Sequence, residues 1–187
     1  MFDSIISLEN LFAAWRKFRR GKRGKPDVQL FERHLENNLF QLHDTLQAKT
    51  YCHGSYERFH VFDPKHRIIH KAIVRDRIVH HAAYRVLAPI FDRSFIFDSY
   101  SCRLQKGTHA AVDRLGQFAR KVSRNYARPC WALKCDVKKF FDSIDHRVLM
   151  RMLSRRISDV GTLWLLREII KSYPSAGGHF ERERERE

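Results

Sequence analysis

The segment Trp131–His146, WALKCDVKKFFDSIDH, combines residue types that could hold a metal ion beside a nucleotide. An apolar run that predicts a buried strand leads directly into Asp136, and Phe140 and Phe141 follow. A carboxylate at the end of a buried strand is well suited to Mg²⁺, because the strand fixes the backbone and the ion prefers hard oxygen ligands. The carbonyl of Val137 can supply a further ligand. A two-metal site for phosphoryl transfer requires more than one carboxylate.

The same residues also have a structural interpretation, which their spacing alone favours. Asp136 could cap a short helix that follows it, and Asp145 is well placed to cap a helix beginning at His146. Phe140 and Phe141 would ordinarily be core residues. Spacing alone therefore favours the helix cap and leaves the metal ligand as the alternative.

The composition predicts a globular protein whose partner is a polyanion. The chain has 187 residues, of which 43% are hydrophobic and 30% charged, and its formal net charge is +15. Such a charge favours nucleic acid first and an anionic membrane second. The four cysteines lack the spacing of a zinc finger, and no signal peptide opens the chain, so we expect reduced thiols in a cytoplasmic protein. No apolar run approaches the roughly 20 residues of a membrane helix, so we expect no membrane partner.

Hydrophobic periodicity predicts a helix-rich chain of the α/β (α+β) class. A hairpin is expected from the aromatic-rich stretch 56–62, the turn DPKH and the return strand RIIHK, and the apolar run 130–137 predicts a strand covered on both faces. Thr108 is expected to cap its helix. Helices are expected over residues 4–20, 26–50, 73–91, 108–125, 145–157 and 159–173. Core-facing positions in the second, third and fourth are expected to be Leu30, Leu35, Leu39, Leu42 and Leu46, then Ile78, Ala82, Val86 and Leu87, then Ala111, Leu115, Phe118 and Val122.

A basic loop interrupts the N-terminal helices. Seven of the ten residues 16–25 are Lys or Arg, and two are glycine. Arg19, Arg20, Lys22 and Arg23 are candidate phosphate contacts. The alternative is a solvated linker, and composition does not separate the two.

Several motifs, in order and at suitable separations, resemble those of reverse transcriptases. ALKCDVKKFFDSIDHRVL resembles the first catalytic motif, and residues 63–115 resemble the finger motifs that precede it. The similarity covers about residues 55–173. The nearest group is the bacterial enzymes of diversity-generating retroelements, with group II intron and retron enzymes more distant.

The resemblance implies the fingers and part of the palm of a right-hand polymerase fold. It divides the chain into an N-terminal helical extension with a basic loop (1–54), fingers (55–128), a partial palm with the first catalytic motif (129–174) and a disordered, charged tail (175–187). The second catalytic motif, aromatic–x–Asp–Asp, does not occur in the sequence. The second catalytic hairpin, the primer grip and the thumb are missing too. We therefore expect an N-terminal fragment that does not polymerise DNA alone.

The resemblance also implies roles for single residues. Asp136 would bind Mg²⁺ with the help of the Val137 carbonyl. Phe141 would be the steric gate that crowds a ribose 2′-OH and so favours deoxynucleotides. Lys65 and Arg67 would contact the triphosphate of the incoming dNTP, although ordinary basic residues at a hairpin tip are an equal alternative.

The segment R…KGTH, with Arg103, Lys106, Gly107 and Thr108, would face the template backbone or substrate phosphates at a helix N-terminus. Gln105 stands where relatives usually have glycine, which puts the geometry of this loop in question. In RDRIVHH, residues 75–81, the candidates are Arg75, Asp76 and Arg77, for which an arginine–aspartate structural pair and a substrate contact both stay open.

The implied function of the complete enzyme is RNA-directed DNA synthesis. Its partners would be an RNA template, a DNA or RNA primer, dNTPs, Mg²⁺ and an accessory protein of a retroelement. One alternative is a non-catalytic, basic RNA-binding module derived from a reverse transcriptase. Another is a purely structural domain with no nucleic-acid partner. The first two both predict salt-sensitive binding of nucleic acid.

Overall fold

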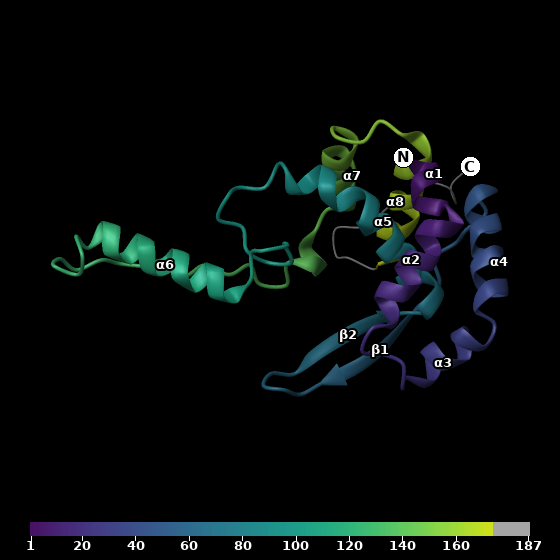
Figure 1. Cartoon of the computed structure of the whole chain (residues 1–187), viewed down its shortest axis with the longest axis horizontal. Coiled ribbons are helices and arrows are strands. Elements are labelled where there is room, and N and C mark those ends of the chain that lie inside the picture. The colour runs from purple at the N-terminus through teal and green to yellow at the C-terminus, as the bar shows by residue number, and fades with distance from the viewer. Residues whose placement is uncertain (174–187) are drawn as a thin grey trace, which may run out of the picture. The chain divides into compact units, whose positions relative to one another are not determined.

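A computed structural model describes residues 1–173, which fall into two compact units (Figure 1). Of the described residues, the first unit contains 1–87 and 139–173, and the second contains 88–138. The helices are α1 (Phe2–Ile6), α2 (Leu8–Arg19), α3 (Pro26–Arg33), α4 (Leu35–Gln47), α5 (Val74–Asp92), α6 (Thr108–Val122), the short 3-10 helix η1 (Phe141–Ser143), α7 (His146–Ser154) and α8 (Val160–Ser172). Strands β1 (Tyr56–Val61) and β2 (Arg67–Ala72) complete the described part.

The helix-rich α/β class is confirmed, with one small antiparallel sheet in the described residues. The arrangement of fingers and palm in a right-hand polymerase stays a prediction. The predicted boundaries at residues 54 and 128 also stay predictions, since the two compact units divide the chain by contacts, not by family motifs. The predicted disorder of residues 175–187 lies outside the described residues.

Two long helices predicted near the N-terminus are each interrupted once. Ser7 has extended backbone angles and its hydroxyl accepts a hydrogen bond from the Asn10 N–H, so it ends α1 and caps α2. His34, outside the helical region of backbone angles, separates α3 from α4. The predictions of single helices over 4–20 and 26–50 are therefore wrong. Leu30, one turn before the second interruption, is exposed.

The core of the first unit lies between helices from both ends of the chain. Helix α1 packs on α2, α4 and α8. Buried side chains of α4 at Leu39, Leu42 and Leu46 confirm the predicted face there, as do Ile78, Ala82 and Leu87 of α5. A Cβ at Gly161 would come within 2.6 Å of the Phe2 ring, so the close approach of α1 and α8 requires glycine.

The β1–β2 hairpin is the prediction that the structure follows most closely. Tyr56 pairs with Ala72, and the ladder continues to Val61 opposite Arg67. In Figure 1 the two strands extend away from the helices of their own unit. Because successive residues of a strand point to opposite faces, Tyr56, Arg58 and His60 share one face.

In the second unit, two predictions of buried structure are wrong. Helix α6 buries none of its residues, and Leu115, Phe118 and Val122, expected to face a core, are exposed. Residues 130–137 form no strand, and Trp131 is 95% exposed. A strand needs a neighbouring backbone for its hydrogen bonds, and the only ladder in the described residues is the hairpin.

The start of α6 also differs from its prediction. Thr108 is the first helical residue, the N-cap is Gly107, and no side chain accepts a capping hydrogen bond there. The prediction of Thr108 as the cap is therefore wrong by one position. In contrast, Asp145 caps α7 as one alternative predicted, because its carboxylate accepts hydrogen bonds from the Arg147 and Val148 N–H groups.

Candidate functional site

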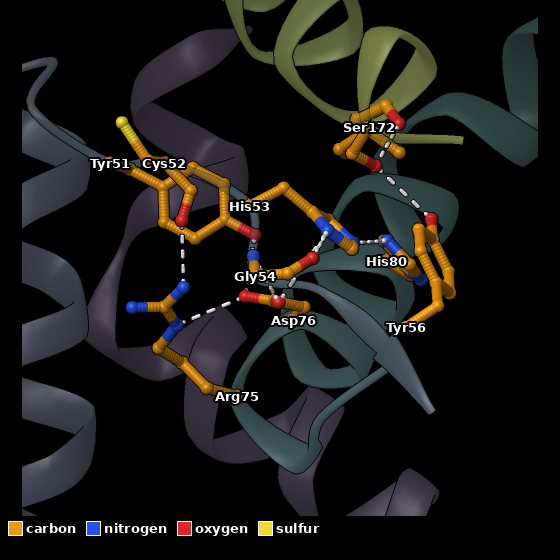
Figure 2. A network of polar contacts seen from close by, with 10 residues as sticks. Tyr51, Cys52, His53, Gly54, Tyr56, Arg75, Asp76, His80 and Ser172 are labelled. Atoms are coloured by element: carbon orange, nitrogen blue, oxygen red, sulfur yellow. Dashed lines mark hydrogen bonds and ion pairs between the residues drawn. The ribbon is translucent and has the colours of Figure 1, made fainter. Parts of the chain in front are cut away.

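A buried carboxylate organises the junction between the N-terminal helices and α5. Asp76 is fully buried and accepts hydrogen bonds from the Tyr51 hydroxyl at 2.9 Å, the Gly54 N–H at 2.8 Å and Arg75 Nε at 2.9 Å. Figure 2 shows these donors converging on one side chain. Arg75 also donates to the Cys52 carbonyl at 2.7 Å. The segment before the hairpin is thereby fastened to the first turn of α5.

These contacts give RDRIVHH a structural role. Asp76 has the donors a buried carboxylate needs, so the arginine–aspartate pair is confirmed as structural. Burial, followed by the charge of Asp76, raises the pKa of the Tyr51 hydroxyl well above its ordinary value, so this hydroxyl remains a donor. Arg77 donates to Asp27 of α3 at 2.6 Å. Burial alone would raise the pKa of Asp27, but hydrogen bonds from Lys71 and Arg77 outweigh it and lower that pKa.

Two histidines, His53 and His80, extend the polar network beyond Asp76 (Figure 2). His53 Nδ1 lies 2.7 Å from the Gly54 carbonyl, so this nitrogen carries a hydrogen and donates it. His53 Nε2 lies 3.1 Å from His80 Nε2. Burial, with a smaller contribution from His53, lowers the pKa of His80 to about 4. His80 is therefore neutral at pH 7, and one nitrogen of the close pair donates while the other accepts.

The candidate site of the first unit is a cavity of about 630 Å³ between the base of the hairpin, α5, η1, α7 and α8. This volume is typical of small-molecule sites, as is a mostly apolar lining with a few polar groups. Its lining residues are Tyr56, Ile68, Ile69, His70, His80, Phe141, Ile144, His146, Leu149, Ile169, Ile170 and Tyr173. Phe141, the predicted steric gate, is 73% exposed and forms part of this wall.

Hydrogen bonds hold two tyrosines in the wall of the cavity. The Ser172 hydroxyl donates to the Ile169 carbonyl at 2.7 Å, so the Tyr56 hydroxyl, 3.1 Å away, donates to Ser172. Tyr173 donates to Asp142 at 3.0 Å. Burial raises the pKa of both tyrosines, and the hydrogen bond to Asp142 adds to the effect at Tyr173. Both rings therefore present neutral hydroxyls at pH 7.

Sequence reasoning identified Phe141 but missed most of its neighbours in this cavity. Tyr56, His70 and Tyr173 come from β1, β2 and the end of α8. Only packing between distant segments brings them together. The paired histidines His80 and His81 in the quoted motif were the one available sequence signal, and no ligand chemistry was assigned to them.

The basic candidates of the first unit differ in how available their charges are. Arg19 forms an ion pair with Glu32, and Lys22 donates to the Phe18 carbonyl at 3.0 Å. Arg20 and Arg23 are exposed. Lys65 lies in the turn and Arg67 begins β2, both exposed at the tip of the hairpin as predicted. Their contact with a triphosphate stays a prediction.

In the second unit the basic residues of the R…KGTH segment build their own loop. Arg103 donates to the Asp92 carboxylate at 2.7 Å and to the carbonyls of Ile96 and Ser99. Lys106 donates to the Phe97 carbonyl and lies over the Phe97 ring. These two side chains thus hold the loop that precedes Gly107 and Thr108. Phosphate contact by this segment stays a prediction.

The backbone angle at Gln105 is one that glycine adopts more easily than glutamine. Its φ is 60°, in the left-handed region that glycine enters without steric cost and other residues enter at about 1–2 kcal/mol. The departure from the family pattern therefore leaves the backbone conformation in place and makes it more costly.

Asp136 and Val137 lie in the irregular, exposed segment of the second unit. The carboxylate and the neighbouring carbonyl are oxygen donors of the kind that Mg²⁺ accepts, and the exposed position leaves room for water ligands. Among residues 1–173, no three His, Cys, Asp or Glu side chains are grouped to hold a metal ion, and the four cysteines are exposed and form no disulfide with one another. Asp136 alone cannot form a two-metal centre.

No helix in the described part of the chain combines the length and apolar character that crossing a bilayer requires. No protein-family model matches the chain. Protein YkfC of Escherichia coli K12 is 32% identical over 99 residues, which are 53% of this chain and 26% of that protein. Nuclear intron maturase 1, mitochondrial, of Arabidopsis thaliana is 28% identical over 99 residues, 53% of this chain and 13% of the relative.

The group II intron-encoded protein LtrA of Lactococcus lactis subsp. cremoris is 25% identical over 97 residues, which are 52% of this chain and 15% of LtrA. The matched segments therefore cover about a quarter or less of these relatives. The last two of these relatives are intron proteins by name, and the predicted nearness to diversity-generating retroelement enzymes stays a prediction.

Proposed function

Because the chain is related to group II intron-encoded proteins and intron maturases, in a reverse transcriptase-like relationship, we propose that it is the N-terminal part of a cytoplasmic RNA-directed DNA polymerase. Its partners are an RNA template, a DNA or RNA primer, dNTPs and an accessory protein of the retroelement. The observation that carries the proposal is the position of Phe141 in the wall of a cavity shared with the base of the hairpin. An aromatic ring there can restrict the sugar of a bound nucleotide.

In this proposal Asp136 holds Mg²⁺ through its carboxylate, and the Val137 carbonyl supplies a second protein oxygen. When bound, the ion stabilises the negative charge that develops on the transferred phosphoryl group. Lys65 and Arg67 neutralise the triphosphate, Arg67 as a two-pronged donor and Lys65 as a point charge. Arg20 and Arg23 contact the nucleic-acid backbone.

The 187-residue chain alone is expected not to extend a primer, because it contains no aromatic–x–Asp–Asp sequence to complete the pair of metal ions. A primer-extension assay with RNA template, dNTPs and Mg²⁺ tests this. A full-length group II intron reverse transcriptase serves as the positive control. Extension by the purified chain, absent when Mg²⁺ is chelated, would contradict the expectation.

The role of Asp136 is tested in a chain completed with the missing catalytic half. Asp136→Asn should lower the rate of extension at least 100-fold while RNA affinity changes little, because one metal ligand is lost. Asp113→Asn is the matched control, since Asp113 is an exposed aspartate of α6 and the charge change is the same. Equal activity of the two variants would remove Asp136 from the catalytic site.

The second candidate is a non-catalytic RNA-binding module, which the net charge of +15 favours equally. The two proposals differ in one outcome. A completed chain that binds RNA in a salt-sensitive manner but never extends a primer supports the binding module.

A further inference from the structure

One face of the hairpin carries a row of rings, of which only Tyr56 and His70 also line the cavity. On β1 this face bears Tyr56, Arg58 and His60, and their partners across the ladder are Ala72, His70 and Ile68. The alternation continues past the strand ends to Phe62 and His66, which contact each other. We call this side of the hairpin the ring face; its residues are Tyr56, Arg58, His60, Phe62, His66, Ile68 and His70.

At the tip of the ring face, two imidazoles form one flat plate. The rings of His60 and His66 are parallel within 2°, their centroids are 4.9 Å apart, and His60 Nδ1 lies 2.6 Å from His66 Nε2. If the two rings were stacked face to face, their nitrogens would be at least one ring thickness apart, and the observed 2.6 Å is shorter than that. The two imidazoles therefore lie side by side, joined through N–H···N.

Phe62 packs nearly parallel to this plate. Its centroid is 4.8 Å from that of His66 and 6.3 Å from that of His60, with interplanar angles of 19° and 18°. The side chain of Phe62 is nevertheless 74% exposed. An isolated exposed aromatic side chain adds little to the stability of the fold. Parallel exposed rings, in contrast, present a surface on which a further flat ring can stack.

Charge and continuity indicate which flat ring would bind. Arg58 on the same face is an exposed cation, suited to the phosphates between successive bases. Toward its base, the ring face passes through Ile68 and His70 into the 630 Å³ cavity that contains Phe141. Single-stranded nucleic acid is bound by this combination of stacking rings and neighbouring cations.

We propose that the ring face binds the unpaired bases of single-stranded nucleic acid by stacking, with Phe62 and the His60–His66 plate as the outermost platform. The inference rests on the proposed function, because it assigns a surface to the single strand that such an enzyme uses. It adds a base-binding site that depends on rings instead of charges, so it predicts that removing bases weakens binding even when every phosphate remains.

The test measures fluorescence anisotropy of labelled probes with the 187-residue chain. The probes are a single strand of about 12 nucleotides, the same backbone made of abasic nucleotides, and the corresponding duplex; this length falls within known single-strand site sizes. The wild-type chain should bind the base-bearing strand about tenfold more tightly than the abasic strand. Phe62→Ala should remove this preference and leave affinity for the abasic strand unchanged.

Phe59→Ala is the matched control, because Phe59 is an exposed aromatic on the opposite face of the same strand. It should keep the preference for bases. Phe62→Trp should keep it too, and should add tryptophan fluorescence that the base-bearing strand quenches and the abasic strand does not. Since both Phe59 and Phe62 are exposed, circular dichroism should show that all three variants are folded.

The outcomes separate this inference from the proposed function. If the wild-type chain binds base-bearing and abasic strands equally, or if Phe62→Ala keeps the preference for bases, the stacking site is refuted while nucleic-acid binding stands. If the wild-type chain binds no probe at low salt, the proposed function fails and the stacking site with it.

Discussion

Replacing Asp76 by asparagine should destabilise the first unit more than any other single change of one polar atom in it. The carboxylate is fully buried and accepts hydrogen bonds from Tyr51, Gly54 and Arg75. An amide keeps one acceptor oxygen but turns an NH₂ group toward donors, so at least one buried donor loses its partner. It also removes the charge that faces Arg75.

The magnitude follows from the burial of each partner. Breaking a buried ion pair costs about 3–5 kcal/mol, and leaving a buried donor unsatisfied costs about 1–3 kcal/mol. The Arg75 side chain is 38% exposed, so water can solvate part of its charge after the change. We therefore expect a loss of about 3 kcal/mol, a large fraction of the 5–15 kcal/mol that stabilises a typical domain.

Urea denaturation followed by circular dichroism and by tryptophan fluorescence measures this loss. The matched control is Asp27→Asn. Asp27 also pairs with two cations, Lys71 and Arg77, but is 34% exposed, so we expect a loss of about 1 kcal/mol or less. If Asp76→Asn costs no more than Asp27→Asn, the buried network does not carry the stability assigned to it.

Three further predictions concern acid, backbone and capping. The pKa of His80 in the fold, about 4, lies below its ordinary 6.5, so its contribution to stability is complete above pH 6.5 and falls as the pH drops toward 4. Because His80 is only partly buried, the loss should be about 1–2 kcal/mol in urea titrations between these pH values, and His80→Gln should flatten the profile. Gln105→Gly should stabilise the second unit by about 0.5–1 kcal/mol, measured as a higher urea midpoint, because it relieves the left-handed backbone; a lower midpoint would contradict this. Asp159→Ala should cost about 1–2 kcal/mol in the same assay, since the carboxylate caps α8 and binds the N–H of Phe2; an unchanged midpoint would refute the cap.

Elements with local determinants could be predicted from the sequence. The hairpin has an aromatic-rich strand and a β-branched return strand on the two sides of a Pro-containing turn, so composition and turn agree, and the strands occur at the expected residues. The interruptions at Ser7 and His34 were missed because the hydrophobic period continues across them. Ser7 was recognisable as an N-cap, but the apolar residues before it favoured one continuous helix.

Elements that depend on distant partners could not be predicted in the same way. Residues 130–137 have the composition of a central strand, yet composition cannot supply the neighbouring backbone that a strand requires. The same reasoning applies to α6, whose apolar positions are spaced for burial but have no covering element within the described part of its unit. The sequence placed Lys65 and Arg67 at the tip of the hairpin, where they lie, but the roles of these two residues and of Phe141 stay predictions. The His53–His80 contact joins residues 27 positions apart, and only the packing of α5 against the preceding segment creates it.

The internal hydrogen bonds of the basic residues change how the net charge should be interpreted. A cation contributes to nucleic-acid affinity when it releases counterions from phosphates, and a cation already bound to a carboxylate or carbonyl must first give up that contact. Arg19, Lys22, Arg103 and Lys106 belong to the second kind. Exposed cations near the hairpin and the basic loop are not engaged in this way, so fewer charges are available to phosphates than a formal net charge of +15 suggests. With a smaller electrostatic contribution, more of the affinity must come from stacking on rings. We therefore expect the exposed ring face of the hairpin to decide whether this chain distinguishes a single strand from a duplex. The number of lysines and arginines should matter less.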